Sequence, residues 1–255
     1  MAEKVRLGDR DVSRIGLGTN RLRKTPQNMA FVRSAVDAGV QMIDTAHLYT
    51  GGESEETIGA ALQPVPSQVV VATKGGFGGA GRGRPDVLRA EIELSLRRLQ
   101  TGVIYLYYLH RVDPSTPIED SLAAIKEFHD HGQIRFVGVS EVTVDQIERA
   151  RKVVPIGAVQ NEYNLAQRRY DAVVDYCTKE HIAFVPFYPL RGQITSRVRE
   201  IAGKRRATPQ QVMLAWLLHR SPVMLPIPGT LSLDHLKENL AAAELQLTDA
   251  ELSQL

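Results

Sequence analysis

Polar side chains able to exchange protons or hold a ligand stand at the ends of successive short apolar runs. Five such runs end, in this order, in Asp44, Lys74, His110, Ser140 and Gln160. If the runs are parallel strands of one closed sheet, their carboxyl ends meet at one rim, and these side chains lie together there. A lone lysine or aspartate at a strand end is usually a solvated or turn residue. Five in succession indicate a site.

Tyr49 follows Asp44 closely in the sequence, and together with Lys74 and His110 it suggests a particular chemistry. A lysine cation beside a tyrosine lowers the pKa of the phenol, while an aspartate holds the lysine in place. Such a tyrosine can give a proton to a developing alkoxide. A neighbouring histidine can bind the same oxygen and orient a carbonyl group. The four residues predict acid catalysis at a carbonyl oxygen.

The elements that must position these residues alternate along the chain. Apolar runs typical of strands buried on both faces cover residues 15–19, 40–46, 69–73, 104–109, 134–139, 158–160, 182–187 and 223–227. Helical patterns cover residues 29–38, 55–62, 85–99, 118–131, 144–153, 170–180, 209–219 and 233–244. Alternating strands and helices predict parallel βαβ units.

About eight such units in a chain of this length favour an α/β fold of the (β/α)8 TIM-barrel type. A doubly wound sheet also alternates, so it is the alternative. Residues 5–7 and 12–14 flank Gly8-Asp9 and predict an N-terminal β-hairpin that closes the bottom of the barrel. No Pro- or Ser-rich linker divides the chain, so residues 1–255 are expected to form a single domain.

Composition excludes several classes of protein. With 31 basic and 29 acidic residues among 255, the chain has no strong field for nucleic acid or an anionic membrane. The single cysteine, Cys177, cannot form an internal disulfide, and a thiol-ligated zinc site needs more than one. No apolar run approaches the ~20 residues of a membrane span. We expect a cytoplasmic enzyme with a small-molecule substrate and no metal; the pattern carries no prediction of oligomeric state.

Two motifs suggest other chemistry on weaker grounds. Residues 76–81 fit G-x-G-x-x-G, but a dinucleotide fingerprint opens a helix at once, and here 82–85 intervene. We expect this segment to be a mobile loop beside the substrate mouth. His129-Asp130-His131 could suggest a metal, but it falls in the last turn of a predicted helix, where basic residues complement the helix dipole.

Residues 44–49 read D-T-A-H-L-Y and residues 52–59 read G-E-S-E-E-T-I-G. They resemble the D-T-A-x-x-Y…S-E-x-x-I-G signature of aldo-keto reductases. Further matches follow in family order at 104–110, 137–140, 159–161, 189–190 and 226–229. The resemblance covers nearly the whole chain. The local sequences at 138–142 and 183–190 are most similar to the bacterial pyridoxal reductase-like branch.

The resemblance implies a barrel that binds NADPH and reduces aldehydes and ketones to alcohols, with pyridoxal to pyridoxine as one candidate reaction. It implies that Asp44, Tyr49, Lys74 and His110 are the catalytic residues. The residues that it assigns to the cofactor are Ser140, Gln160, Phe187, Leu190, Thr230, Ser232, His235, Glu238 and Asn239. Of these, Ser140 and Gln160 would bind the nicotinamide carboxamide, and Phe187 would stack on its ring.

Three departures from the family pattern bear on the cofactor. Glu141 stands where Asn is usual, and Gly229 and His235 stand where many NADPH-using members have Lys and Arg. Because those two cations are missing, we expect only a modest preference for NADPH and leave NADH open as the alternative, while Glu141 affects one contact with the nicotinamide carboxamide. The segment after Leu190 is short and leads almost directly to a helix, which predicts a more open cofactor groove.

The sequence thus predicts an NADP-dependent oxidoreductase that acts on CH–OH donors and on carbonyl compounds. Two alternatives remain at this point. Lys74 could be the Schiff-base nucleophile of a barrel lyase, or the chain could be a non-catalytic, nicotinamide-binding regulatory subunit.

Overall fold

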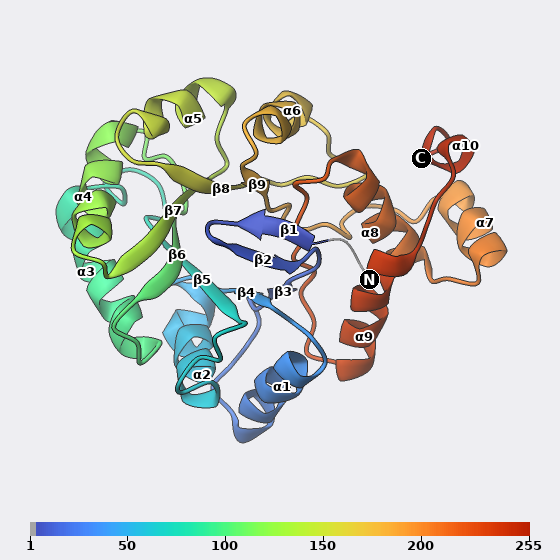
Figure 1. The fold of residues 1–255 in the computed structure, drawn as a ribbon. Helices are drawn as coiled ribbons and strands as arrows, with labels where there is room; N and C mark the ends of the chain where they lie inside the picture. The colour runs from blue at the N-terminus through green and yellow to red at the C-terminus, as the bar shows by residue number, and fades with distance from the viewer. Residues whose placement is uncertain (1–3) are drawn as a thin grey trace.

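The computed structural model of the protein describes residues 4–255. Its centre is a curled, seven-stranded parallel sheet in which the strands pair in the order of the chain, with helices around the outside (Figure 1). The strands are β3 (Leu17–Gly18), β4 (Met42–Asp44), β5 (Val70–Gly75), β6 (Ile104–Leu109), β7 (Ile134–Ser140), β8 (Ile156–Gln160) and β9 (Ala183–Phe184). This order is that of a barrel, so the doubly wound alternative is wrong.

The eighth predicted strand, at residues 223–227, is not a regular strand, although it does close the ring. Isolated parallel bridges join the segment 223–229 to β9 on one side and to β3 on the other. Pro226 and Pro228 have no N–H group, so toward β3 the segment can only accept hydrogen bonds, from the N–H groups of Gly16 and Gly18. The missing donors interrupt the ladder without opening the barrel.

The predicted helices are all present, with ends that differ by a few residues. They are α1 (Pro26–Asp37), α2 (Glu53–Ala61), α3 (Pro85–Arg98), α4 (Ile118–Asp130), α5 (Val144–Arg151), α6 (Asp171–Lys179), α8 (Pro209–Arg220) and α9 (Leu233–Ala241), the last followed by η2 (Ala242–Glu244). The helix expected soon after Leu190 is α7 (Ser196–Arg205), and α10 (Asp249–Leu252) was not predicted. None of the helices in residues 4–255 has the length and apolar character needed to cross a membrane.

The predicted N-terminal hairpin is confirmed. Strands β1 (Lys4–Leu7) and β2 (Arg10–Ser13) pair antiparallel and lie across the centre of the ring in Figure 1. Val5, Leu7 and Val12 are buried against the inward-facing side chains of the barrel strands, among them Met42, Val70, Leu106 and Ala158. Because the hairpin blocks this end, access to the barrel interior is from the carboxyl ends of the strands.

Candidate active site

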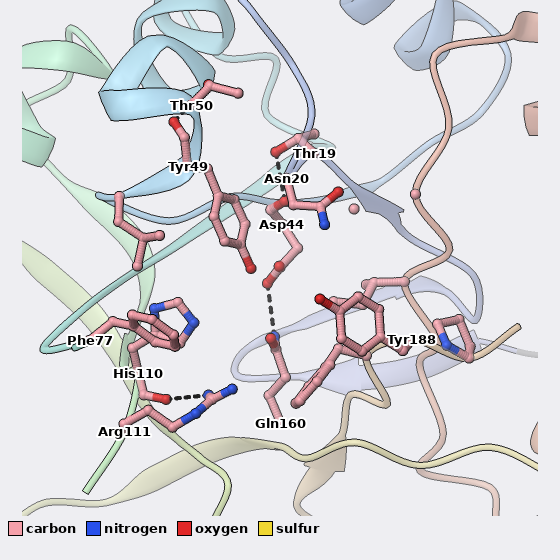
Figure 2. Close-up of a pocket in the computed structure, with 16 residues that line it drawn as sticks. Thr19, Asn20, Asp44, Tyr49, Thr50, Phe77, His110, Arg111, Gln160 and Tyr188 are labelled. Carbon is pink, nitrogen blue, oxygen red and sulfur yellow. Dashed lines mark hydrogen bonds between the residues drawn. The ribbon is translucent and has the colours of Figure 1, made fainter. Parts of the chain in front are cut away.

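A cleft of about 350 Å³ opens at the carboxyl ends of the strands. Five predicted site residues line it, and Figure 2 shows four of them converging from different elements. The five are Asp44, Tyr49, His110, Gln160 and Phe187. The parallel barrel thus brings together residues that are far apart in the sequence.

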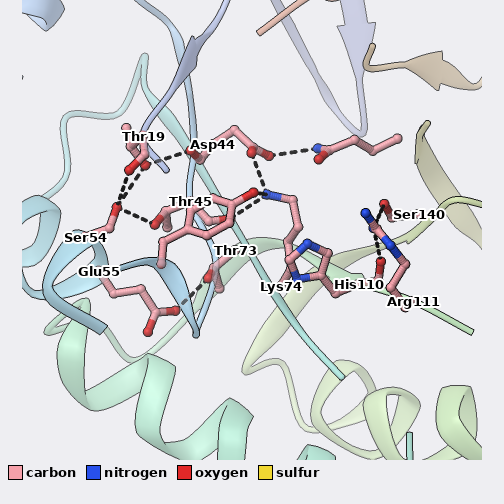
Figure 3. Close-up of polar contacts among 12 residues, drawn as sticks. Thr19, Asp44, Thr45, Ser54, Glu55, Thr73, Lys74, His110, Arg111 and Ser140 are labelled. Atoms are coloured by element: carbon pink, nitrogen blue, oxygen red, sulfur yellow. Dashed lines mark hydrogen bonds and ion pairs between the residues drawn. The ribbon is translucent and has the colours of Figure 1, made fainter. Parts of the chain in front are cut away.

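Lys74 lies directly behind this cleft, in β5, and is fully buried. Its Nζ lies 2.5 Å from Oδ1 of Asp44 and donates to the backbone oxygen of Thr45 at 2.6 Å. Figure 3 shows Lys74 between Asp44 and His110. The same Nζ is 3.5 Å from the hydroxyl of Tyr49. The ammonium group therefore connects the buried carboxylate to the phenol that faces the cleft.

Both carboxylate oxygens of Asp44 have partners, since Nε2 of Gln160 donates to Oδ2 at 2.8 Å. Burial raises the pKa of Asp44, and Lys74 and Gln160 only partly offset this. Burial lowers the pKa of Lys74, but Asp44 and Tyr49 raise it by more, so it lies above its usual value. Lys74 is accordingly a protonated, ion-paired cation near neutral pH.

A tight left-handed turn sets the position of Tyr49. Tyr49 starts the short helix η1 (Tyr49–Gly52), in which Thr50, Gly51 and Gly52 all have positive φ. The φ of Gly52 is 101°, a conformation that residues with a side chain rarely adopt, and a Cβ atom there would also displace the guanidinium of Arg98. Glycine is therefore required at this point of the turn.

The lowered pKa that the sequence predicts for Tyr49 is wrong. Burial raises the pKa of Tyr49 above 10.0 and outweighs the opposing effect of Lys74, while Asp44 raises it further. The sequence contains the charges that act on this phenol, but the extent of its burial depends on the folded cleft. The charge of Lys74 still favours the tyrosinate, so it limits how far burial raises the pKa of Tyr49.

His110 is buried beside Tyr49, and the two rings meet edge to face at 6.0 Å between centroids. Burial, Lys74 and Arg111 hold the pKa of His110 well below 6.5, so the imidazole is neutral at physiological pH. Its Nδ1 atom has no hydrogen-bond partner among residues 4–255. A neutral imidazole carries one N–H donor, which here can serve a ligand oxygen in the cleft.

The three residues expected around the nicotinamide lie at the same rim, and Leu190, expected at the cofactor without a stated place on it, does not line the cleft. Ser140 is buried, and its hydroxyl accepts a hydrogen bond from Arg111 at 3.1 Å. The ring of Phe187 is a wall of the cleft and packs against Tyr188 at 5.2 Å between centroids. Leu190 is not among the cleft walls and instead packs against the outer hydrophobic core.

The five residues expected at the adenosine end lie in α9 or just before it, and none of them is a wall of the cleft. Ser232 caps α9 by accepting from the N–H of His235, and Thr230 accepts from the N–H of Ser232. The side chains of His235 and Glu238 are exposed, whereas Asn239 is buried. Gly229, directly before Thr230, is a wall of the cleft, so the two regions are contiguous.

Glu141, which stands where the family has Asn, does not line the cleft. Its φ of 55° is left-handed, a conformation that Asn tolerates better than Glu. Its Oε1 accepts from the N–H of Glu162 at 2.7 Å, and its Oε2 pairs with Arg169 at 2.8 Å. The chain thus has a carboxylate where the family has an amide, and Arg169 of a neighbouring loop compensates its charge.

Other cleft walls were not predicted from the sequence, namely Thr19, Asn20, Leu48, Arg111 and Tyr188. Arg111 directly follows His110, and this adjacency is the one available signal. Phe77 of the glycine-rich segment also lines the cleft, so the predicted place of that loop beside the mouth is confirmed.

The glycine-rich segment 76–81 and the His129-Asp130-His131 motif do not form a separate nucleotide or metal site within the described residues. After the glycine-rich segment the next helix begins only at Pro85, as expected for a loop. His129 contacts the backbone oxygen of Ile134, and Asp130 pairs with Lys126. Within residues 4–255 no cluster of His, Cys, Asp and Glu could hold a metal ion.

A comparison of the sequence with known protein families identifies the family to which this site geometry belongs. The model of the aldo/keto reductase family matches residues 14–255. The chain belongs to the aldo/keto reductase family. It is therefore an oxidoreductase, as the motifs predict.

Two curated relatives match this aldo/keto reductase over nearly its whole length. Pyridoxine 4-dehydrogenase of Escherichia coli is 37% identical over 276 residues, covering 98% of the chain and 96% of the relative. An uncharacterized oxidoreductase of Schizosaccharomyces pombe is also 37% identical, covering 100% of the chain and 89% of the relative. The first supports the resemblance to the pyridoxal reductase-like branch.

A solved structure gives the same result for the fold. An aldo-keto reductase of Klebsiella pneumoniae, crystallised with NADPH, superposes with a TM-score of 0.90 at 28% identity, covering 100% of the chain and 94% of that protein. The similarity supports the barrel with its hairpin over the described residues.

Proposed function

We propose that this aldo/keto reductase reduces aldehydes and ketones to alcohols, with NADPH as its cofactor and Tyr49 as the acid. The observation that carries the proposal is the link from Asp44 through the buried Nζ of Lys74 to the Tyr49 hydroxyl at the cleft. A structural ion pair alone does not require a hydroxyl at its end, whereas proton transfer to a carbonyl oxygen needs a donor that faces the substrate, and the Tyr49 hydroxyl is such a donor.

The residues around the cleft fit NADPH. Buried polar side chains of Ser140 and Gln160 lie at the rim, and the ring of Phe187 provides an aromatic face. At the contiguous outer region, the capped N-terminus of α9 offers backbone N–H groups suited to a phosphate. When bound, NADPH supplies the hydride for the carbonyl carbon.

In this proposal the hydroxyl of Tyr49 gives its proton to the carbonyl oxygen. Lys74 stabilises the tyrosinate that remains, because its charge opposes the effect of burial on the phenol. The neutral imidazole of His110 donates a hydrogen bond to the same oxygen and orients the carbonyl. Asp44 keeps Lys74 charged and in position.

The pKa shifts give a pH prediction. Tyr49, with its pKa above 10.0, is protonated near neutral pH, and His110, with its pKa well below 6.5, is uncharged. The kcat/KM for reduction should thus stay level between about pH 6 and 9, and alcohol oxidation, which needs tyrosinate, should rise with pH. Steady-state rates in both directions measure this. An acid limb with a midpoint at the usual pKa of histidine would contradict the assigned state of His110.

We further propose pyridoxal, reduced to pyridoxine, as a substrate. The proposal rests on the name of the Escherichia coli relative and on the aromatic walls formed by Phe77, Phe187 and Tyr188, which suit a pyridine ring. The test is NADPH oxidation with pyridoxal, compared with aromatic aldehydes, methylglyoxal and simple ketones, with the product identified by chromatography. If other carbonyls react and pyridoxal gives no pyridoxine, the substrate is wrong and the carbonyl reductase assignment stands.

Cofactor choice gives a second prediction. Gly229 has no side chain and His235 is exposed at the start of α9, so the two cations usual around the 2′-phosphate are absent. His235→Arg should tighten NADPH by about 1–2 kcal/mol through a charge-assisted contact, with little change for NADH. Fluorescence titration of both cofactors measures the two dissociation constants. Equal tightening of NADPH and NADH would show that position 235 does not face the phosphate.

The lyase alternative is disfavoured by the state of Lys74. A Schiff-base lysine must be a free amine, but this Nζ is fully buried, ion-paired at 2.5 Å and has a raised pKa. The single domain over residues 1–255 and the cytoplasmic location stay predictions from the sequence.

A further inference from the structure

Arg111 is a cationic wall of the cleft without an acidic partner. Its Nη1 donates to the backbone oxygen of His110 at 2.6 Å and to the hydroxyl of Ser140 at 3.1 Å. Its other guanidinium nitrogens, Nη2 and Nε, donate to no group in the described residues, and no carboxylate there forms an ion pair with it. One edge of the guanidinium is fixed, and the other remains available.

Two aromatic rings flank this guanidinium. It lies 5.3 Å from the ring centroid of Phe77 and 5.5 Å from that of Phe187. Burial lowers the pKa of Arg111, with partial compensation from Glu141 and the hydroxyls of Tyr49, Tyr170 and Tyr188. Removing a cation from water without pairing it is costly, and an anion brought to it offsets that cost.

Glu141 is the carboxylate with the largest electrostatic effect on Arg111, but it is not available as an ion-pair partner. Glu141 is held by the N–H of Glu162 and by Arg169, each within hydrogen-bonding distance, and it does not line the cleft. Figure 2 shows Arg111 beside His110 with its guanidinium directed toward Gln160, on the side of the cleft where Tyr49 and His110 meet. An anion paired with Arg111 would therefore lie next to the reacting carbonyl.

We propose that Arg111 binds an anionic oxygen group of the substrate, a carboxylate or a phosphate, while the carbonyl of the same molecule lies at Tyr49 and His110. The inference rests on the proposed carbonyl reduction and names its preferred substrate class. A planar guanidinium with a free edge matches the two oxygens of such a group, and an ammonium group could not do so in the same way.

The experiment compares matched pairs of carbonyl compounds that differ by the anionic group. The pairs are benzaldehyde with 3-carboxybenzaldehyde, and pyridoxal with pyridoxal 5′-phosphate. For each pair the quantity is the ratio of kcat/KM for the anionic compound to that for the neutral one. A ratio cancels any general loss of activity, and the two pairs separate carboxylate from phosphate.

In Arg111→Met the ratio should fall about 10- to 100-fold for at least one pair, as expected for a lost charge-assisted contact. Arg111→Lys should recover only part of the lost ratio, because lysine restores the positive charge but not the planar pair of N–H donors. Arg197→Met is the matched control: Arg197 is exposed, pairs with Glu200 at 2.6 Å and does not line the cleft, so both ratios should stay as in the wild type.

Three outcomes overturn the inference, and they are distinguishable. If the wild-type protein oxidises NADPH neither with the four compounds nor with methylglyoxal and simple ketones, the proposed function fails and the inference fails with it. If it reduces those other carbonyls but none of the four, only the inference fails. If reduction occurs but Arg111→Met changes neither ratio, only the inference fails. In that case the NADPH dissociation constant of Arg111→Met shows whether the residue positions Ser140 at the cofactor instead.

Discussion

Tyr49→Phe should lower kcat for carbonyl reduction by about 10²- to 10⁴-fold, because it removes the proton donor and keeps the ring. NADPH affinity should hardly change, since the hydroxyl contacts Lys74 and faces the cleft, not the region around α9. Single-turnover rates with saturating NADPH measure the chemical step. Fluorescence titration measures the cofactor affinity.

Tyr107→Phe is the control for this substitution. Tyr107 is fully buried in β6, and its hydroxyl has no partner among residues 4–255, so its removal should leave both rate and stability nearly unchanged. A Tyr49→Phe variant that kept more than about a tenth of the wild-type single-turnover rate would show that another group supplies the proton, since a general acid contributes at least ~10²-fold.

Lys74→Met should lower both activity and stability. It leaves the Asp44 carboxylate buried with Gln160 as its remaining side-chain partner. Breaking one side of a buried pair typically costs about 3–5 kcal/mol of unfolding free energy, and partial protonation of Asp44 would reduce this. Without the cation the pKa of Tyr49 should rise further, so kcat should fall as well. Denaturant unfolding and steady-state kinetics measure the two effects.

The double variant Asp44→Leu/Lys74→Met separates the structural role from the chemical one. Replacing both partners of a buried pair by apolar groups is often nearly neutral for stability. The double variant should therefore regain most of the lost unfolding free energy and none of the lost activity. Recovery of activity together with stability would mean that Lys74 acts only by holding the fold.

Most of the barrel was predictable, because buried strands and amphipathic helices have distinct periods in the sequence. The exception is the last strand, where Pro226 and Pro228 remove the donors that a regular ladder needs. The clustering of Asp44, Tyr49 and His110 at the cleft was also predictable, since parallel strands end at one rim.

What depends on burial was not predictable. The raised pKa of Tyr49 results from the loss of solvent around the phenol, which spacing does not reveal. Leu190 packs against the outer core although its neighbour Pro189 lines the cleft, and this depends on how the loop after Phe187 turns. The sequence shows that Arg111 follows His110, but only the folded cleft shows that its guanidinium has no carboxylate partner among the described residues.

The most direct test of the account follows the hydride itself. The protein is incubated with an aldehyde that it consumes and with NADPH carrying deuterium at both C4 positions, and the alcohol product is analysed by mass spectrometry and NMR. The account predicts one deuterium on the carbinol carbon, with Tyr49→Phe slowing its appearance. Consumption of the aldehyde with no deuterium in the product, together with borohydride trapping of an adduct on Lys74, would contradict it.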